Sequence, residues 1–237
     1  MGILSFAGCF AVALSPAATL YAMVIRHEPQ LIIVMVGSAF LWLCAISLVA
    51  LGWALLPLAS PSPLLAAAAA AQEASRWLGH ALYTRLAGGL SRAGLHAVPS
   101  PRRAAPLPLA VASGVGVGAM HVLVLHADVL RRARLPGALY EPSCTHLSAF
   151  SLAALRSLGM LLTNLLLSLI GWVAAFPNRS RRLLGAMLLL HCLAAGAALL
   201  PGGCVPSLAG LLAAVALTAG LAAHVTLAAV ARPELKS

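Results

Sequence analysis

The chain has 237 residues, of which 62% are apolar and only 20 are charged (15 Lys or Arg and 5 Asp or Glu). A soluble domain cannot hide that much apolar surface, and a bilayer span needs about 20 apolar residues. The composition therefore excludes a cytosolic enzyme, a disordered chain and a coiled coil. It predicts an all-α, polytopic membrane protein with a single membrane domain over residues 1–237.

Apolar runs predict seven transmembrane helices, at residues 3–25, 31–56, 64–86, 107–127, 146–176, 183–200 and 205–231. The first run could be a signal peptide, but it lacks a basic leading region and a second apolar run follows directly. The third is interrupted by charged residues and is followed by a loop at 87–106. The fifth is longer than a bilayer needs, so it must tilt or extend beyond the membrane.

The distribution of basic residues predicts the orientation. With the amino terminus outside, ten basic residues fall on the cytosolic side and three on the outer side, and cytosolic loops carry the excess of Lys and Arg. The amino terminus is therefore expected to be lumenal and the carboxyl terminus cytosolic. The cytosolic set is Arg26, Arg85, Arg92, Arg102, Arg103, Arg179, Arg181, Arg182, Arg232 and Lys236, and the outer set is Arg131, Arg132 and Arg134.

The formal net charge of +10 could suggest a nucleic-acid partner. The basic residues, however, are scattered between apolar blocks without interleaved aromatic residues, so no nucleic-acid binding is expected. The five cysteines form no ligand spacing for a metal, and no cofactor is expected. The predicted orientation places Cys144 and Cys204 in adjacent lumenal loops, where they could form a disulfide; the sequence leaves this open.

Small residues recur every fourth position in the fourth predicted span, at Ala110, Gly114 and Gly118. At 100° per residue they share one face of the helix. Small residues let helix backbones approach closely in lipid, so this stripe predicts a helix-docking face. His121 and Asp128 fall on the same face. Gly116 points towards a different neighbour or lipid and is expected to tolerate a larger side chain.

Ionisable residues inside predicted spans are costly to bury unless they have partners. Glu73 and Arg76 are three residues apart, which predicts an ion pair on one helix face. His191 lies in the middle of the sixth predicted span. We interpret it as a hydrogen-bonding residue in a polar cavity between helices, because no nucleophile, carboxylate or metal ligand accompanies it in the sequence.

Motifs of intramembrane hydrolases are incomplete in this chain. Ser113-Gly114 lacks the first Gly of a rhomboid-type GxSG motif, and Asp128 lacks the preceding residues of GxGD. No HExxH pattern is present for a zinc site. A small-molecule or proton transporter remains an alternative, since several ionisable residues lie in the spans, and an intramembrane hydrolase ranks third.

The order of these features resembles the anterior pharynx defective family, the scaffold subunit of the gamma-secretase complex. The resemblance rests on the opening with Gly8, Cys9 and Pro16, on Gly37 and Trp42, on Gln72, Glu73 and Arg76, on Ala110, Gly114, Gly118, Ala127 and Asp128, on Ser148 to Phe150, and on Gly185, His191 and Gly196. The family's intramembrane His in the fifth span is absent here. Arg156 and Asn164 are the nearest polar residues, and His121 is a candidate substitute.

The resemblance implies a non-catalytic assembly subunit without a cofactor. Its partners would be presenilin-like and nicastrin-like membrane subunits, against whose membrane segments it would pack. It would reside in the endoplasmic reticulum, the Golgi and later secretory or endosomal membranes, with its amino terminus in the lumen.

Overall fold

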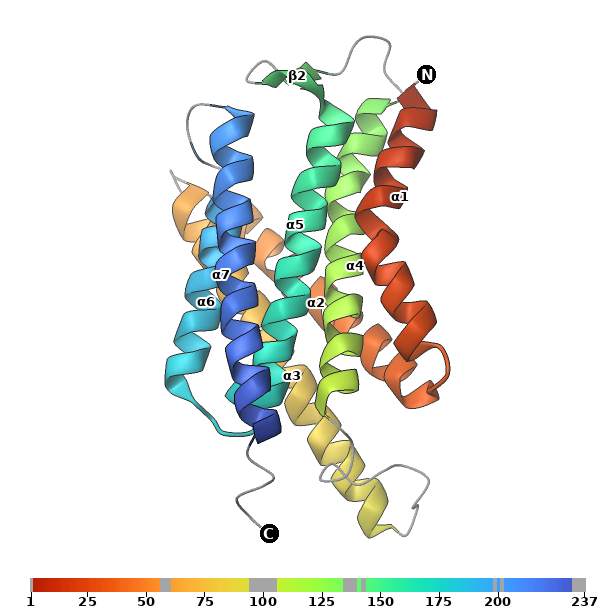
Figure 1. The fold of residues 1–237 in the computed structure, drawn as a ribbon, viewed down its shortest axis with the longest axis vertical. Helices are drawn as coiled ribbons and strands as arrows, with labels where there is room; N and C mark the ends of the chain where they lie inside the picture. Colours follow the sequence, from red (N-terminus) through yellow and green to blue (C-terminus); the bar gives the residue numbers. More distant parts are fainter. Residues whose placement is uncertain are drawn as a thin grey trace.

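The computed structural model describes residues 2–55, 61–93, 106–133, 140–141, 144–197, 200 and 203–231. Within these ranges the chain forms seven α-helices that lie side by side in one bundle (Figure 1). They are α1 (Gly2–Leu20), α2 (Pro29–Leu55), α3 (Pro61–Arg92), α4 (Pro106–Ala133), α5 (Ala149–Ile170), α6 (Arg181–Gly196) and α7 (Cys204–Ala231). The predicted all-α, polytopic fold class is confirmed.

Two π-helical segments extend α1 and α5: η1 (Tyr21–Ile25) and η2 (Gly171–Ala175). A short antiparallel ladder joins β1 (Tyr140–Glu141) to β2 (Cys144–Ser148) at the end of the bundle where α1 begins (Figure 1). The helix α7 ends at the opposite end of the bundle.

Five of the helices, α1 with η1, α2, α4, α5 with η2, and α7, are long and apolar enough to cross a membrane. The other two fall short for different reasons. The 32-residue α3 carries Glu73, Arg76 and Arg85, and α6 has only 16 residues. Both pack within the bundle, α3 against α2 and α6, and α6 against α7. That α3 and α6 also cross the membrane stays a prediction.

The start of the fifth predicted span is wrong by three residues. Residues 146–148 belong to β2, and α5 begins only at Ala149. The Ser148 side chain accepts a hydrogen bond of 3.1 Å from the Ser151 N–H and so caps the first turn. Side-chain capping by serine competes with continued helix on the amino-terminal side, and the apolar pattern alone did not reveal this boundary.

The loop predicted from residue 87 onwards begins later than expected, because α3 continues to Arg92 and extends past the other helices (Figure 1). Gly88 and Gly89 are strong turn signals in a sequence, yet they lie inside this helix. The Arg92 Nε donates a hydrogen bond of 3.2 Å to the Gly88 carbonyl, which covers one of the last helical acceptors.

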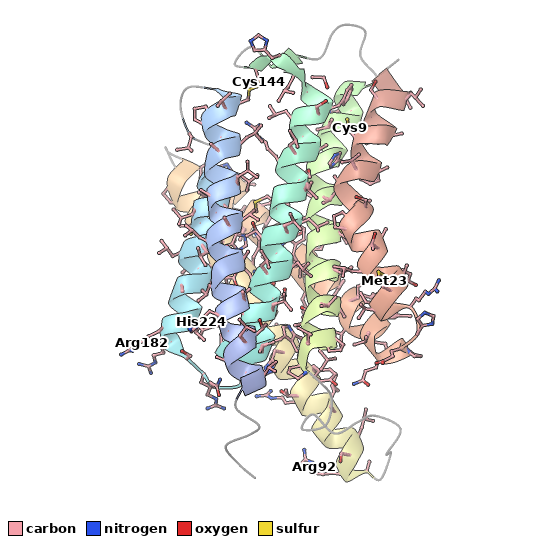
Figure 2. All side chains as sticks on the ribbon, viewed as in Figure 1. Cys9, Met23, Arg92, Cys144, Arg182 and His224 are labelled. Carbon is pink, nitrogen blue, oxygen red and sulfur yellow. A yellow bond between two sulfur atoms is a disulfide. The ribbon has the colours of Figure 1, made fainter. Side chains whose placement is uncertain are left out.

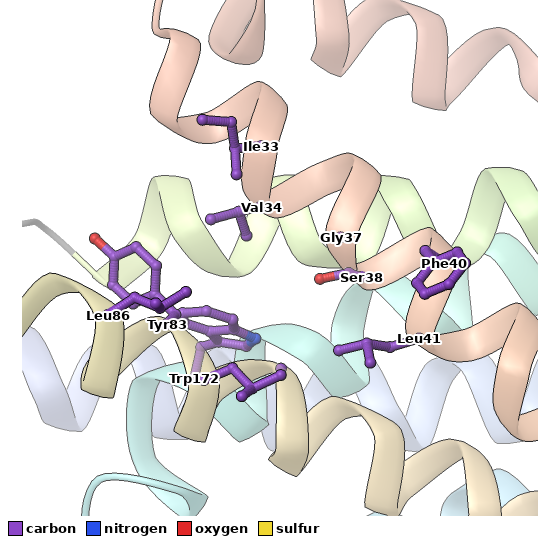
Figure 3. Close-up of a pocket in the computed structure, with 11 residues that line it drawn as sticks. Ile33, Val34, Gly37, Ser38, Phe40, Leu41, Tyr83, Leu86 and Trp172 are labelled. Carbon is purple, nitrogen blue, oxygen red and sulfur yellow. The ribbon is translucent and has the colours of Figure 1, made fainter.

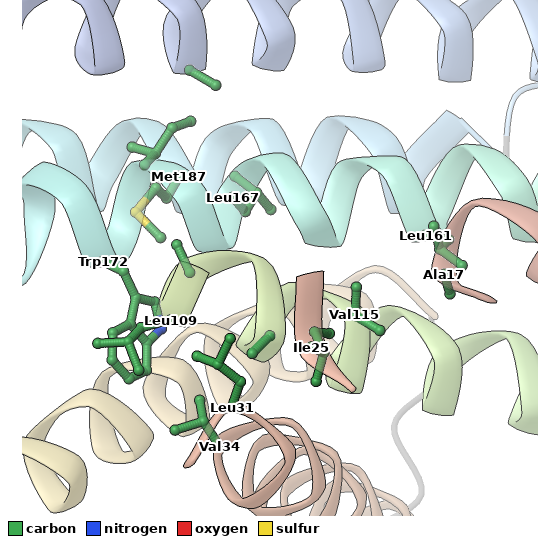
Figure 4. Close-up of a cluster of buried hydrophobic side chains, with 14 of the residues drawn as sticks. Ala17, Ile25, Leu31, Val34, Leu109, Val115, Leu161, Leu167, Trp172 and Met187 are labelled. Atoms are coloured by element: carbon green, nitrogen blue, oxygen red, sulfur yellow. The ribbon is translucent and has the colours of Figure 1, made fainter. Parts of the chain in front are cut away.

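The helices α4 and α5 form the centre of the bundle, and α1 packs across both. Figure 4 shows the core around these helices, in which Leu161 and Leu167 of α5 and Met187 of α6 are fully buried. Outward-facing Leu, Ile and Val side chains remain exposed on α1, α2 and α7. This arrangement suits a protein that is surrounded by lipid, where outer apolar side chains have an apolar solvent.

Cys144 and Cys204 form a disulfide, with their Cα atoms 5.4 Å apart. The bond joins β2, directly before α5, to the first residue of α7 (Figure 2 labels Cys144). The pairing that the sequence left open is therefore present in the structure.

Candidate functional site: a buried polar network and a membrane-facing groove

The polar residues of α3 start a hydrogen-bonded network inside the bundle. Arg76 is only 2% exposed and forms an ion pair with Glu73, as their spacing predicts. Both lie on the side of α3 that faces the other helices, where water cannot solvate them. An ion pair in such surroundings needs further hydrogen bonds to offset its desolvation.

A histidine on α6 supplies one of these bonds. The His191 Nδ1 donates to Glu73 Oε1 over 2.6 Å, and the His191 side chain is completely buried. The same carboxylate oxygen thus receives both Arg76 and His191. Glu73 therefore connects α3 to α6. The geometry agrees with the interpretation of His191 as a hydrogen-bonding residue, but its partner is a carboxylate, which the sequence had not placed beside it.

Asn164 of α5 occupies the other side of the arginine. Arg76 Nη2 donates to Asn164 Oδ1, and the Asn164 amide donates to the Met160 carbonyl over 2.8 Å. The amide nitrogen also lies 3.4 Å from His121 Nδ1 on α4. Asn164 thus supplies the polar side chain that α5 contributes to the network, and His121 of α4 lies close to it.

Trp42 and Gln72 complete the network towards α2. The Trp42 indole N–H donates to Gln72 Oε1 over 2.6 Å, and its ring centroid lies 5.2 Å from that of His121. Sequence reasoning used Trp42 only as part of the family resemblance and did not assign a role to Asn164. A polar residue in the middle of an apolar run was the available signal for Asn164.

His126, another buried histidine of α4, has partners other than the network residues described above. His126 bonds to the Val122 carbonyl over 3.0 Å and packs edge-on against Phe6 and Phe10 of α1. Asp128 lies within α4, but its side chain is outside the described residues. The structure therefore brings together His121, His191, Glu73 and Arg76 of the predicted buried polar set.

The small-residue stripe of α4 faces α5 of the same chain. A Cβ added at Gly114 would lie 2.8 Å from the Leu165 Cα, and one at Gly118 would lie 3.1 Å from the Leu161 Cγ. Ala110 is fully buried. The close approach is thus already made within the bundle, so these residues are not open to a partner subunit.

The structure contradicts the expectation that Gly116 tolerates a larger side chain. A Cβ there would lie 2.1 Å from the Met35 carbonyl oxygen of α2. Real Cβ atoms do not approach a backbone so closely, and a packed interior does not yield easily. The α4 helix therefore meets two neighbours through glycine, α5 on one side and α2 on the other.

A groove of about 350 Å³ runs between α2 and α3 on the outside of the bundle (Figure 3). Its lining is mostly apolar and includes the exposed side chains of Ile33, Phe40 and Leu82. Gly37 lies in this groove, and nothing lies within 4 Å of a Cβ added there. In contrast to the glycines of α4, Gly37 has open space in front of it.

Fold and site together define a polytopic α-helical membrane protein. Hydrogen-bonded and ion-paired polar side chains are buried between five of its helices, and an open groove lies on its outer surface. The sequence matches the family model described as Aph-1 protein over residues 4–231, so the chain belongs to the Aph-1 family. This confirms the resemblance that the motifs indicated.

Two curated relatives agree with the family match. The chain is 29% identical over 181 residues to "Gamma-secretase subunit Aph-1" of Drosophila melanogaster, covering 75% of this chain and 74% of the relative. It is 30% identical over 154 residues to "Gamma-secretase subunit APH1-like" of Arabidopsis thaliana, covering 62% of each chain.

Proposed function

We propose that this chain is a non-catalytic scaffold subunit of a gamma-secretase-like intramembrane protease complex. It packs against presenilin-like and nicastrin-like membrane segments in the endoplasmic reticulum, the Golgi and later secretory or endosomal membranes. The names of the relatives support the assignment to such a complex. The scaffold role is supported by the buried polar network, in which the ionisable groups bond to one another and fix the positions of five helices.

The groove between α2 and α3 is the observation that carries the scaffold proposal. Large apolar side chains line it, and Gly37 leaves the α2 backbone accessible from outside. Lipid offers no hydrophobic driving force for helix association, so a partner helix gains from close packing against small residues. A transmembrane helix of a partner subunit fits this surface.

A substitution at Gly37 tests this proposal without disturbing the interior. Gly37→Leu fills the groove from its open side, so the variant should insert and fold while co-purification of the presenilin-like subunit falls at least about fivefold, which corresponds to about 1 kcal/mol. Gly220→Leu on α7 is the matched control, since nothing lies within 4 Å of a Cβ there either. Equal recovery of the partner with both variants would refute the groove as its docking surface.

A proton or small-molecule transporter is the alternative function, and the same network favours it. His191, Glu73, Arg76, Asn164 and His121 form a continuous chain of polar groups between helices. A transporter predicts flux in proteoliposomes that hold this chain alone, and loss of flux in Glu73→Gln. The scaffold proposal predicts the same flux for vesicles with wild type, with Glu73→Gln and without protein.

A further inference from the structure

A basic hollow lies at the turn between α5 and α6, separate from the polar network and from the outer groove. Its volume is about 510 Å³, and its lining combines Arg179 and Arg181 with Trp77, Phe176 and Leu184. The turn lies at the end of the bundle opposite the Cys144–Cys204 disulfide (Figures 1 and 2). Side chains from α3, η2 and α6 therefore meet here around one space.

The two arginines of this hollow are available to a ligand. Both are exposed, and within the described part of the chain neither makes a hydrogen bond or an ion pair through its side chain. A guanidinium presents a planar set of donors that matches phosphate oxygens. Two such groups beside one hollow thus favour an anion with several oxygens.

The backbone presents these arginines from an ordered turn. Arg179 has φ 49°, in the left-handed region that residues other than glycine seldom adopt. Backbone hydrogen bonds hold the turn, from Arg179 N–H to the Phe176 carbonyl (3.3 Å) and from Ser180 N–H to the Ala175 carbonyl (3.0 Å). The position of Arg179 is consequently fixed by the connection between η2 and α6.

The other wall of the hollow is apolar. The Trp77 side chain is 52% exposed, and Leu184 and Phe176 lie beside the arginines. Tryptophan is enriched at membrane interfaces, where one part of the ring contacts lipid and another contacts polar groups. A free anion would use only the basic side, whereas a phospholipid would use both sides.

We propose that this hollow binds the phosphate headgroup of an anionic phospholipid from the adjoining leaflet, with the glycerol and upper acyl carbons against Trp77 and Leu184. Basic pockets between membrane helices bind anionic headgroups in this way. The leaflet is the cytosolic one if the orientation of the proposed scaffold holds, but the site itself does not depend on that function.

Native mass spectrometry of the full-length protein in a neutral detergent tests the site. The protein is loaded with phosphatidylserine or phosphatidylcholine, and the fraction that retains lipid is measured. Arg181→Gln should reduce retention of phosphatidylserine about fivefold relative to wild type, since one basic side chain near an anionic lipid surface has an effect of that order. Trp77→Ala should reduce it as well.

Arg182→Gln is the matched control, because it removes the same charge from the next residue, which does not line the hollow and lies at the outside of the bundle (Figure 2). We expect wild-type retention in this variant. Equal losses in Arg181→Gln and Arg182→Gln, or equal retention of the two lipids, would overturn the site. If inorganic phosphate displaces phosphatidylserine completely, and Trp77→Ala retains as much phosphatidylserine as the wild type, the hollow binds a free anion. That result would overturn the proposal that its ligand is a phospholipid.

Discussion

Glu73 is the residue on which the buried network converges, since its Oε1 atom receives both the Arg76 guanidinium and the His191 imidazole. Neither donor is accessible to water, because Arg76 is 2% exposed and His191 is fully buried. A buried charge that loses its partner keeps its full desolvation penalty. The Glu73 carboxylate therefore contributes more to the stability of the fold than an exposed acidic residue would.

Glu73→Gln tests this role of the carboxylate. We expect a loss of about 3–5 kcal/mol in the free energy of unfolding, because Arg76 remains buried without its counter-charge. Thermal unfolding of the purified protein in detergent measures the change. Glu28→Gln is the control, since Glu28 is exposed in the turn before α2, and its effect should stay within about 0.5 kcal/mol. Similar stability of both variants would contradict the proposed role.

A substitution of Asn164 tests the same network from the side of α5. Asn164→Leu removes the acceptor of Arg76 Nη2 and should lower the free energy of unfolding by about 1.5–3 kcal/mol, the range for hydrogen bonds to charged groups. Thr163→Val is a matched control on the same helix, because the equally buried Thr163 hydroxyl bonds to the Gly159 carbonyl of α5 itself. A larger loss in Thr163→Val, again measured by thermal unfolding, would show that Asn164 is not a supporting residue.

At the scale of the element, α4 is shaped by glycine on two faces. Gly114 and Gly118 allow contact with α5, and Gly116 allows contact with α2. The i, i+4 spacing indicates that the first face is one of close approach, but it could not say which helix would occupy it. Gly116 falls outside that spacing, and its role depends on the path of α2, which no local pattern contains.

The contact distances predict an order of effects for alanine substitutions in α4. Gly116→Ala should destabilise more than Gly118→Ala, because its Cβ would meet backbone atoms at 2.1 Å, whereas that of Gly118 would first meet a side-chain atom at 3.1 Å. Gly220→Ala, in open space, should gain up to about 1 kcal/mol from helix propensity. Unfolding temperatures measure the order, and its reversal would contradict the packing described for α4.

The disulfide connects two elements whose cysteines are 60 residues apart. In the chain-entropy model, closing a loop of this size stabilises by about 4 kcal/mol. Cys144→Ser should therefore lower the unfolding temperature as strongly as Cys204→Ser, and the double variant should add little. Thiol labelling provides the direct check, because labelling that does not rise after reduction would show that the bond is absent.

At the scale of the whole molecule, the sequence predicted the fold class, the number of helices and most of their limits, because long apolar runs bounded by Pro and Arg are a strong local signal. It could not predict the capped start at Ser148, the continued α3 or the groove at Gly37. Those features depend on hydrogen bonds and neighbours that are distant in the chain. Some members of the network could be singled out from the sequence, since Glu73, Arg76 and His191 are ionisable residues in apolar runs, whereas the uncharged Asn164 gives a weaker signal.

The orientation of the bundle is a further prediction at this scale. The ten-to-three distribution of basic residues predicts that the α5–α6 turn faces the cytosol and the α6–α7 turn faces the lumen. In sealed vesicles from a variant without the free cysteines Cys9, Cys44 and Cys192, Arg181→Cys should react with a membrane-impermeant reagent only from the cytosolic side. Leu200→Cys should react only from the lumenal side, and the opposite pattern would exclude this orientation.

The scaffold proposal is tested most directly by identifying the membrane proteins that remain bound to the full-length chain after purification in a mild detergent. The account predicts recovery of a presenilin-like and a nicastrin-like subunit in comparable amounts by quantitative mass spectrometry, with the presenilin-like subunit lost in Gly37→Leu and retained in Gly220→Leu. Recovery of the chain alone, under conditions in which both subunits are present in the membrane and stay bound to each other, would contradict the account.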